Sequence, residues 1–222
     1  MKIGYWGHIK GLGEHIKFVA AYTNTPFEEV GHGDEWFATV KASIDLEFPN
    51  LPYLIDGDFS LTESQAIPYY IALKANRQDL VGKDAQSKAR VLMLEGVIND
   101  LKNEVVKAVF SGKHEEEMKK LATEGKVVQK AKWLSAFLGE KDFFLGEITL
   151  ADFYAACILT MCSIFMKSSG ADDVILCHEN LKQLCKRVKA LPGIAERVQS
   201  ECYKKTWYPA SMTPFEEVAE DI

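Results

Sequence analysis

Apolar and polar residues are spaced in two different patterns along this chain, and the pattern changes near residue 77. Before that point, short apolar runs separated by glycine, proline and polar turns indicate strands, with helical periods between them. After it, strand patterns stop and apolar residues recur at the spacing of amphipathic helices. The pattern predicts a small α/β domain over 1–76, a polar linker over 77–86 and an all-helical domain over 87–222.

The α/β domain is expected to begin with a strand, a helix and a second strand, which suit a parallel βαβ unit with a right-handed crossover. Asp56-Gly57 is typical of a hairpin turn and predicts a strand on either side of it. Thr62 and Gln65 form a capping-box pattern before the last helix. The residues between 31 and 48 are expected to be irregular or loosely helical. The predicted strands and helices lie, in order, at 2–6, 14–22, 27–30, 53–55, 59–61 and 66–73.

The helical domain begins with a long helix whose apolar residues share one face, namely Val91, Leu94, Ile98, Leu101, Val105 and Val109. Thr149 and Asp152 repeat the capping-box pattern before a strongly apolar helix. The apolar stretch 155–166 is shorter than the ~18 residues that suggest a membrane span, so we interpret it as a buried helix. The predicted helices lie at 88–110, 114–120, 127–138, 153–166, 180–189 and 194–202.

Composition and charge exclude some classes of partner. The net charge of −6 and the absence of a basic stripe argue against nucleic acid, and no long apolar segment predicts a secretory signal or a membrane anchor. The cysteines are odd in number and lack Cys-x-x-Cys spacing, so we expect reduced thiols in a cytoplasmic protein. We see no metal-ligand cluster, nucleotide loop or Ser-His-Asp arrangement.

Two local features of the α/β domain stand out, a proline turn and a helix start that suits the binding of a carboxylate. Pro52 cannot donate to a ladder and belongs at the first residue of a strand, and its X-Pro bond is a candidate for the cis form found in demanding turns. Ser64 lies at a helix start, whose N–H groups are a natural seat for a carboxylate. Each feature also has a purely structural explanation, as a turn proline and as a helix cap.

Four segments resemble the cytosolic glutathione transferases, and most of all the mu class: Gly4-Tyr5-Trp6 with Gly11-Leu12, 48–57, 62–67 and 148–153. The resemblance covers the chain from about residue 2 to about residue 200. It implies a thioredoxin-like N-terminal domain followed by an all-α domain, a homodimer, and glutathione as co-substrate with no further cofactor. The implied reaction is detoxification, in which the glutathione thiolate attacks a hydrophobic electrophile.

The resemblance gives the catalytic role to Tyr5, at the end of the first strand. A tyrosine hydroxyl, with a pKa of about 10, stays protonated and can donate to a thiolate, which favours the ionised sulfur. The alternative is an ordinary aromatic residue of a strand. No cysteine precedes Cys157, which argues against disulfide exchange.

The implied glutathione site combines backbone, polar and charged groups. The peptide of Leu51 pairs with the cysteinyl part of glutathione, Ser64 binds the γ-glutamyl carboxylate, and Glu63 accepts from the γ-glutamyl amine. Lys41 matches the lysine for the glycyl carboxylate, and its alternative is a solvated surface charge. The complete predicted set is Tyr5, Trp6, Leu12, Trp36, Lys41, Asn50, Leu51, Pro52, Glu63, Ser64 and Asp100.

Three further assignments concern an indole and a second subunit. Trp36 is preferred to Phe37 as a ligand contact because an indole N–H can donate. Asp100 matches the acid that reaches the partner's γ-glutamyl amine, or is a solvent-facing helix acid. Phe48 matches the aromatic that inserts between helices of the other subunit, or lies in the core of its own chain.

The electrophile pocket should be concave and mainly apolar, and its candidates are His8, Leu12, Asn103, Phe110 and Tyr208. His8 has the alternative of a solvated loop residue. Phe110 stands where mu enzymes often have a tyrosine, so slower addition to epoxides or enones is expected.

The sequence departs from the mu pattern in two segments, and it leaves two other functions as alternatives. The segment 31–36 is shorter than the mu loop, and the turn 7–10 is one residue longer. The other functions are a non-catalytic carrier or structural protein that binds glutathione or apolar ligands, and a glutathione-dependent isomerase or peroxidase.

Overall fold

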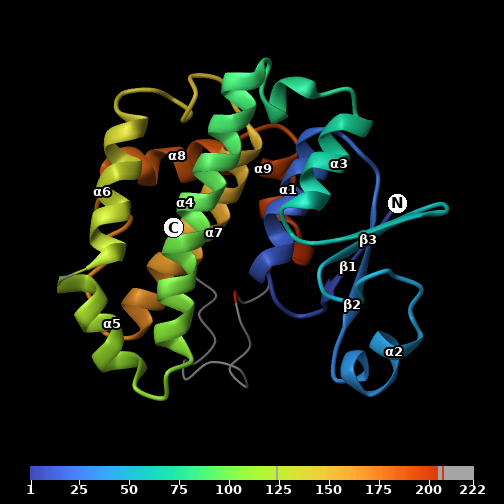
Figure 1. Cartoon of the computed structure of the whole chain (residues 1–222), viewed down its shortest axis with the longest axis horizontal. Coiled ribbons are helices and arrows are strands. Elements are labelled where there is room, and N and C mark those ends of the chain that lie inside the picture. The colour runs from blue at the N-terminus through green and yellow to red at the C-terminus, as the bar shows by residue number, and fades with distance from the viewer. Residues whose placement is uncertain (124, 205–206, 208–222) are drawn as a thin grey trace.

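The computed structural model describes residues 1–123, 125–204 and 207, and it places a sheet half beside a helical half (Figure 1). The sheet half contains β1 (Lys2–Trp6), the 3-10 turn η1 (Gly11–Gly13), α1 (Glu14–Tyr22), β2 (Glu28–His32), the π-helical turn η2 (Trp36–Val40), α2 (Lys41–Ser43), β3 (Tyr53–Asp56), β4 (Phe59–Thr62) and α3 (Ala66–Lys74). The helical half contains the 3-10 turn η3 (Gln78–Val81), α4 (Ala85–Val109), α5 (His114–Thr123), α6 (Lys126–Leu138), α7 (Leu150–Ser168), α8 (Glu179–Lys189), α9 (Ile194–Gln199) and the 3-10 turn η4 (Glu201–Tyr203).

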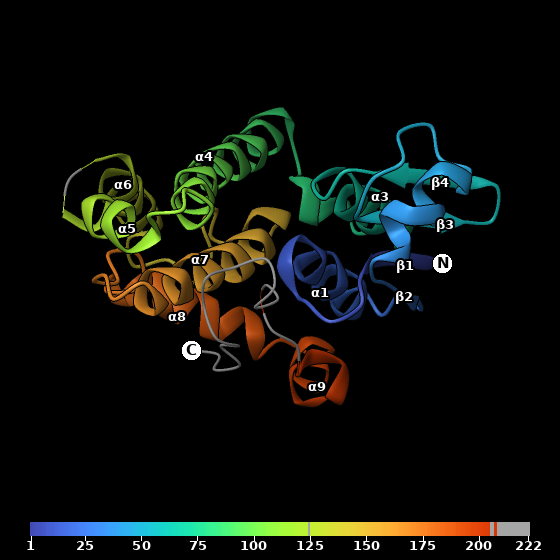
Figure 2. The ribbon, with the colours of Figure 1, turned by 90° about the horizontal axis from the view of Figure 1, so that it is seen from below.

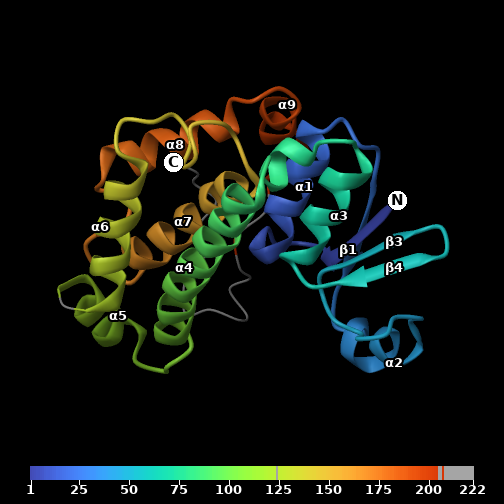
Figure 3. The ribbon, with the colours of Figure 1, turned by 45° about the horizontal axis from the view of Figure 1, so that its top comes forward.

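The sheet has the strand order β2-β1-β3-β4. β1 pairs in parallel with β2 and antiparallel with β3, and β3 and β4 form the hairpin predicted at Asp56-Gly57. The parallel βαβ unit is therefore confirmed, with β1 and α1 at their predicted bounds. β2 begins one residue later than predicted and extends to His32. α1 and α3 contact each other and lie between the sheet and the helical half (Figures 1 and 3).

This arrangement confirms the predicted fold class, a thioredoxin-like α/β domain followed by an all-α domain. The division into 1–76, 77–86 and 87–222 stays a prediction. The segment 77–86 contains η3 and the start of α4, because Asp84 and Ser87 form a capping box that starts the helix at Ala85 instead of residue 88. The apolar face predicted for α4 is buried along its whole length.

α7 is the central helix of the helical half, and α1, α4, α5 and α8 all contact it (Figure 2). Its start is the predicted capping box: Thr149 donates to Asp152 from its N–H (2.8 Å) and its hydroxyl (2.9 Å). Among the described residues, α7 is the one helix long and apolar enough to cross a membrane, and 94% of its apolar window is buried in this core. The interpretation as a buried core helix is confirmed.

The other predicted capping box is wrong. Thr62 pairs with Tyr53 as the last residue of β4, and Gln65, which precedes α3, makes no side-chain cap hydrogen bond. Between them Glu63 has a φ of +76°, in the left-handed region. Because the strand holds Thr62 in the sheet, its hydroxyl cannot reach back over the helix start, although the bounds of α3 agree with the prediction to one residue.

A buried ion cluster joins the two halves where α9 meets α1 (Figure 3). Arg197 of α9 donates to Glu14 (Nε–Oε1, 2.5 Å) and to Glu29 (Nη1–Oε1, 2.7 Å), and Lys17 also binds Glu29 (2.7 Å). Burial alone raises the pKa of Glu29, but the positive charges of Lys17 and Arg197 outweigh it and lower this pKa to about 2. The cluster holds two negative and two positive charges, so the buried charges balance.

Candidate active site

Tyr5 lies at the end of β1 with its ring held on both sides by the following turn. It is 5% exposed, and the backbone N–H of Leu12 donates to its hydroxyl oxygen at 2.9 Å. A Cβ on Gly11 would lie 2.5 Å from that oxygen, and one on Gly13 would lie 2.7 Å from the ring. The two glycines are therefore required for the turn to close over Tyr5. A hydroxyl that accepts one hydrogen bond keeps its own proton to donate.

The Leu51–Pro52 peptide bond is cis, and Pro52 is buried one residue before β3 begins at Tyr53. Gly4 pairs with Tyr53, so the β1–β3 pairing ends next to Tyr5 on one strand and next to Pro52 on the other. Gly4 is required here, because a Cβ would lie 2.1 Å from the Tyr53 ring. The sheet therefore brings the cis Leu51–Pro52 turn close to the backbone of Tyr5, and the cis bond considered from the sequence is present.

The turn from β4 to α3 contains Glu63, which is exposed, and Ser64, which is half-buried. The carbonyl of Glu63 accepts from the N–H groups of Ala66 and Ile67, at 3.1 Å each, which begins the helix. No side chain caps α3, so the polar groups of this turn remain available to a ligand.

Four further predicted glutathione contacts, in the sheet half, differ in their exposure. Lys41 and Asn50 are exposed, and Trp6 is half-buried. Trp36 is 1% exposed in a small cluster with Tyr53 and Leu46, which leaves its side chain little surface to offer a ligand. Phe37, the other candidate, is 67% exposed and lies against Trp6 with ring centroids 5.6 Å apart.

The comparisons with known proteins decide the family. The model of the glutathione S-transferase N-terminal domain matches residues 1–73, and that of the glutathione S-transferase C-terminal domain matches residues 99–201. The chain belongs to the glutathione S-transferase family. Glutathione S-transferase Mu 3 of Macaca fuscata fuscata is 34% identical over 92% of this chain and 90% of its own length. Glutathione S-transferase 2 of Gallus gallus is 34% identical over 94% of this chain and 95% of its own.

Structural similarity agrees with this assignment. The crystal structure of the glutathione S-transferase Blo t 8 has a TM-score of 0.81 and 28% identity, and it covers 99% of this chain and 100% of its own. The chain is thus a mu-class-like glutathione S-transferase, and the family supports a glutathione transferase enzyme. The predicted resemblance to mu-class-like glutathione transferases is confirmed.

The described electrophile candidates of this transferase lie in exposed or half-buried positions. His8 and Asn103 are exposed, Leu12 is half-buried and Phe110 is 52% exposed at the end of α4. Tyr208 lies outside the described residues. Their role stays a prediction.

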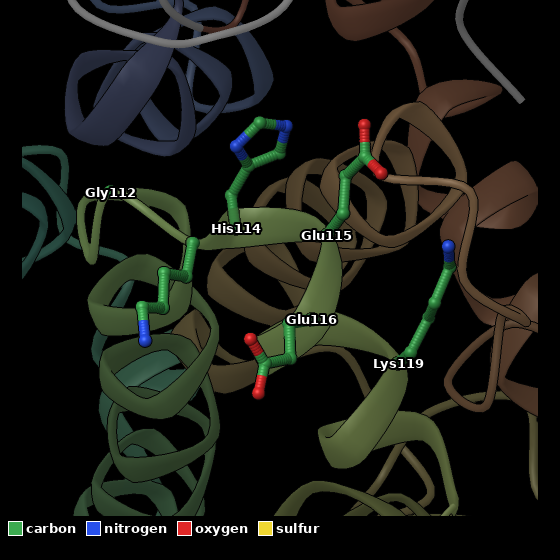
Figure 4. A pocket seen from close by; sticks show the side chains of 6 residues that line it. Gly112, His114, Glu115, Glu116 and Lys119 are labelled. Atoms are coloured by element: carbon green, nitrogen blue, oxygen red, sulfur yellow. The ribbon is translucent and has the colours of Figure 1, made fainter.

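A hollow of about 550 Å³ follows Phe110 directly, and sequence reasoning missed it. In Figure 4 the side chains of His114 and Glu115 project the same way from the first turn of α5, whereas Glu116 points to the opposite side. The charged run that contains these residues indicated only a solvated helix face. No sequence signal distinguishes such a face from a polar hollow. Its lining is Gly112, Lys113, His114, Glu115, Glu116 and Lys119.

The two residues expected at a subunit interface are both on the surface. Phe48 is 73% exposed, so the alternative of a core residue in its own chain is wrong. It borders a hollow of about 250 Å³ that Glu63 and the β4 strand also line. Asp100 is exposed on α4, and Lys130 of α6 donates to its carboxylate at 2.9 Å.

Proposed function

We propose that this transferase binds glutathione along the Leu51–Pro52 turn, with the glutathione sulfur at the hydroxyl of Tyr5. The sheet supports this placement, because β1 and β3 pair as far as Gly4 and Tyr53, the residues that adjoin Tyr5 and Pro52 in the sequence. The peptide of Leu51 then pairs with the cysteinyl residue as an added strand would. The hydrogen bond from Leu12 to the Tyr5 oxygen carries the proposal, since it fixes where the hydroxyl proton can point.

The chemistry follows from that hydrogen bond. A thiol with a pKa of about 8.5 is ionised only to a few per cent at neutral pH. The Tyr5 hydroxyl donates to the sulfur and stabilises the thiolate, and the Leu12 N–H polarises the hydroxyl further. The thiolate then attacks the electrophile, its lone pair forms the carbon–sulfur bond, and the leaving group departs with the electron pair of the broken bond. The site holds both reactants in position.

The two ends of glutathione bind to opposite sides of Tyr5. Ser64 and the uncapped start of α3 take the γ-glutamyl carboxylate, and Glu63 accepts from the γ-glutamyl amine. Lys41 and Asn50 take the glycyl end, with an aromatic contact from the pair Trp36–Phe37. The exposure of Lys41 and Asn50 supports their availability.

The hydrophobic electrophile lies on the helical side, against Leu12 and Phe110. Phe110 supplies apolar contact and no hydroxyl. Phe110→Tyr is therefore expected to speed the addition of glutathione to epoxides or enones, whereas an unchanged rate would contradict the placement of Phe110. The five free cysteines support a reducing, cytoplasmic setting.

The enzyme acts as a homodimer in which Phe48 contacts the other subunit. Asp100 approaches the γ-glutamyl amine of the glutathione that is bound to the other subunit. The 73% exposure of Phe48 supports this, because a large apolar side chain on the surface commonly marks an interface. Phe48→Ser is expected to shift the sedimentation of the protein from dimer toward monomer. A dimer of unchanged stability would argue against the role of Phe48.

The test of the catalytic proposal is Tyr5→Phe, assayed by conjugation of glutathione to an aryl halide. The loss of one hydrogen bond to a charged sulfur should lower kcat about 10- to 100-fold and should remove the ultraviolet band of bound thiolate. The matched control is Tyr70→Phe, which removes a hydroxyl that bonds Asp56 at 2.7 Å on the hairpin and should leave the rate within about twofold. Equal activity in native protein and Tyr5→Phe would refute the role of Tyr5. A native protein that is retained on immobilised glutathione but has no activity would be a carrier.

A further inference from the structure

The start of α3 has one backbone acceptor that its own helix cannot satisfy. In an α-helix the N–H of residue 68 donates to the carbonyl of residue 64, but residue 68 is proline and has no N–H. The preceding bond, from Ile67 to Glu63, is formed at 3.1 Å. The carbonyl of Ser64 therefore needs a donor from elsewhere.

His15 supplies that donor from α1, 49 residues earlier in the chain. Its Nε2 lies 2.8 Å from the carbonyl oxygen of Ser64. Because a carbonyl can only accept, Nε2 carries the proton and donates. Burial lowers the pKa of His15 to about 4, so the ring is neutral and Nδ1 holds a lone pair. Nδ1 is buried without a hydrogen-bond partner among the described residues, which agrees with this tautomer.

The imidazole of His15 is held in place from the helical half. It is 2% exposed and meets the ring of Tyr154 edge-on, with centroids 5.0 Å apart. The hydroxyl of Tyr154, on α7, donates to Asn99 of α4 at 3.3 Å. His15 therefore connects the turn at Ser64 to the two longest helices of the other half.

The direction of the Ser64 carbonyl also sets the direction of an N–H. The carbonyl of Ser64 and the N–H of Gln65 belong to one planar trans peptide, in which they point in opposite directions. With the carbonyl bound to His15, the N–H of Gln65 points away from the core. Neither the Ser64 nor the Gln65 N–H has an acceptor within the part of the chain that the structure describes.

We propose that His15 is a positioning residue for glutathione: its Nε2–H replaces the N–H that Pro68 lacks, and thereby aims the N–H of Gln65 at the γ-glutamyl carboxylate. This inference rests on the proposed binding of that carboxylate at Ser64. Without His15 the Ser64–Gln65 peptide rotates to bring its carbonyl to water, and the carboxylate loses an oriented donor.

The test is His15→Leu, which removes the donor and keeps an apolar side chain. The KM for glutathione should rise about tenfold, the value for one hydrogen bond to a charged group, while the KM for the aryl halide and kcat at saturating glutathione stay within about twofold. Adding Pro68→Ala to this variant restores an N–H at the helical position and should return the KM for glutathione to within about twofold of native. A residue that only fills space would not be rescued in this way.

Two controls make every outcome decisive. His15→Gln can present an amide N–H to the same carbonyl and should keep a nearly native KM for glutathione. If His15→Leu fails to fold, His15→Gln takes its place as the test. A tenfold higher KM for glutathione in the folded glutamine variant would then overturn the proposal. Binding of cysteinylglycine, which has no γ-glutamyl group, should be the same in native protein and His15→Leu.

Ser64→Ala separates this inference from the proposed function. If Ser64→Ala raises the KM for glutathione and His15→Leu does not, the role of His15 is refuted and the glutathione site stands. If neither variant changes this KM, the placement of the γ-glutamyl carboxylate at Ser64 is refuted, and the role of His15 with it. If His15→Leu raises the KM for glutathione and the added Pro68→Ala does not lower it again, the proposal is also overturned.

Discussion

Two helix starts in this molecule share one sequence pattern and have opposite structures. Before α7, at what we call the closed start, Asp152 accepts from the N–H and hydroxyl of Thr149 and also from the N–H of Phe144 at 2.9 Å. Before α3, Thr62 belongs to a strand and Gln65 makes no cap. The start of α7 has side-chain hydrogen bonds within its own chain, whereas at the start of α3, which we call the open start, the N–H groups of Ser64 and Gln65 have no acceptor among the described residues.

The difference comes from what precedes each helix. Thr149 follows a loop and adopts an extended conformation with φ of −138°, from which its side chain reaches the helix. Thr62 is fixed by its pairing with Tyr53, and the chain needs the left-handed turn at Glu63 to leave the sheet. A capping-box pattern therefore predicts a cap only where no strand holds its first residue.

The largest expected effect on stability comes from removing the Asp152 carboxylate at the closed start. Asp152→Ala leaves two buried N–H groups and a hydroxyl without an acceptor, and should lower the free energy of unfolding by roughly 3 kcal/mol or more. In a chain of this length that corresponds to a fall of about 6–12 °C in Tm. Thermal unfolding followed by circular dichroism measures it. A change below about 1 kcal/mol would show that the closed start contributes little to stability.

The carboxyl of Asp152 at the closed start should also make the stability of the fold depend on pH. Burial raises the pKa of Asp152 from 3.8 to about 6, against the opposing hydrogen bonds from Phe144 and Thr149. Between these values the folded state keeps a proton that the unfolded state has released, so stability falls as pH rises from about 4 to about 6, on the order of 3 kcal/mol. Urea unfolding at a series of pH values should show this slope in native protein and a smaller one in Asp152→Asn. Identical slopes would contradict the assignment.

A matched pair of substitutions compares the two starts directly. Thr149→Val and Thr62→Val each replace a hydroxyl by a methyl of the same shape. The first removes a donor to Asp152 and should cost about 1 kcal/mol, whereas the second should stay within about 0.5 kcal/mol because Thr62 caps nothing. Chemical unfolding of both variants in parallel is the measurement. Equal losses would mean that the open start is capped after all.

The smallest effect concerns the strain of the open start. Glu63→Gly removes a left-handed non-glycine residue and should stabilise the fold by about 0.5 kcal/mol, since the entropy of glycine offsets part of the gain. The same change removes the carboxylate proposed to accept from the γ-glutamyl amine, so the KM for glutathione should rise. Glu63→Ala serves as control, because it keeps the strain and loses the carboxylate. A glycine variant less stable than the alanine variant would contradict this explanation.

Local patterns were sufficient for much of the fold. The bounds of β1 and α1, the hairpin at Asp56-Gly57 and the cap of α7 all agree with expectation, because neighbouring residues determine them. The contact of His15 with Ser64 spans 49 residues and follows from a missing N–H at Pro68, so no local pattern contains it. The hollow at 112–119 escaped for a different reason, since a charged helix turn has the same sequence whether it faces open water or a depression.

The ion cluster at α9 has a consequence for how this chain is made. Glu14 is synthesised early and is completely buried, yet its partner Arg197 emerges from the ribosome 183 residues later. Until then the first domain, which folds first in most proteins, must keep a bare carboxylate in water or hold it only beside Lys17. The N-terminal domain therefore cannot reach its final packing during its own synthesis, and a fragment that ends before α9 should stay loosely folded at α1 even though every residue of its sheet is present.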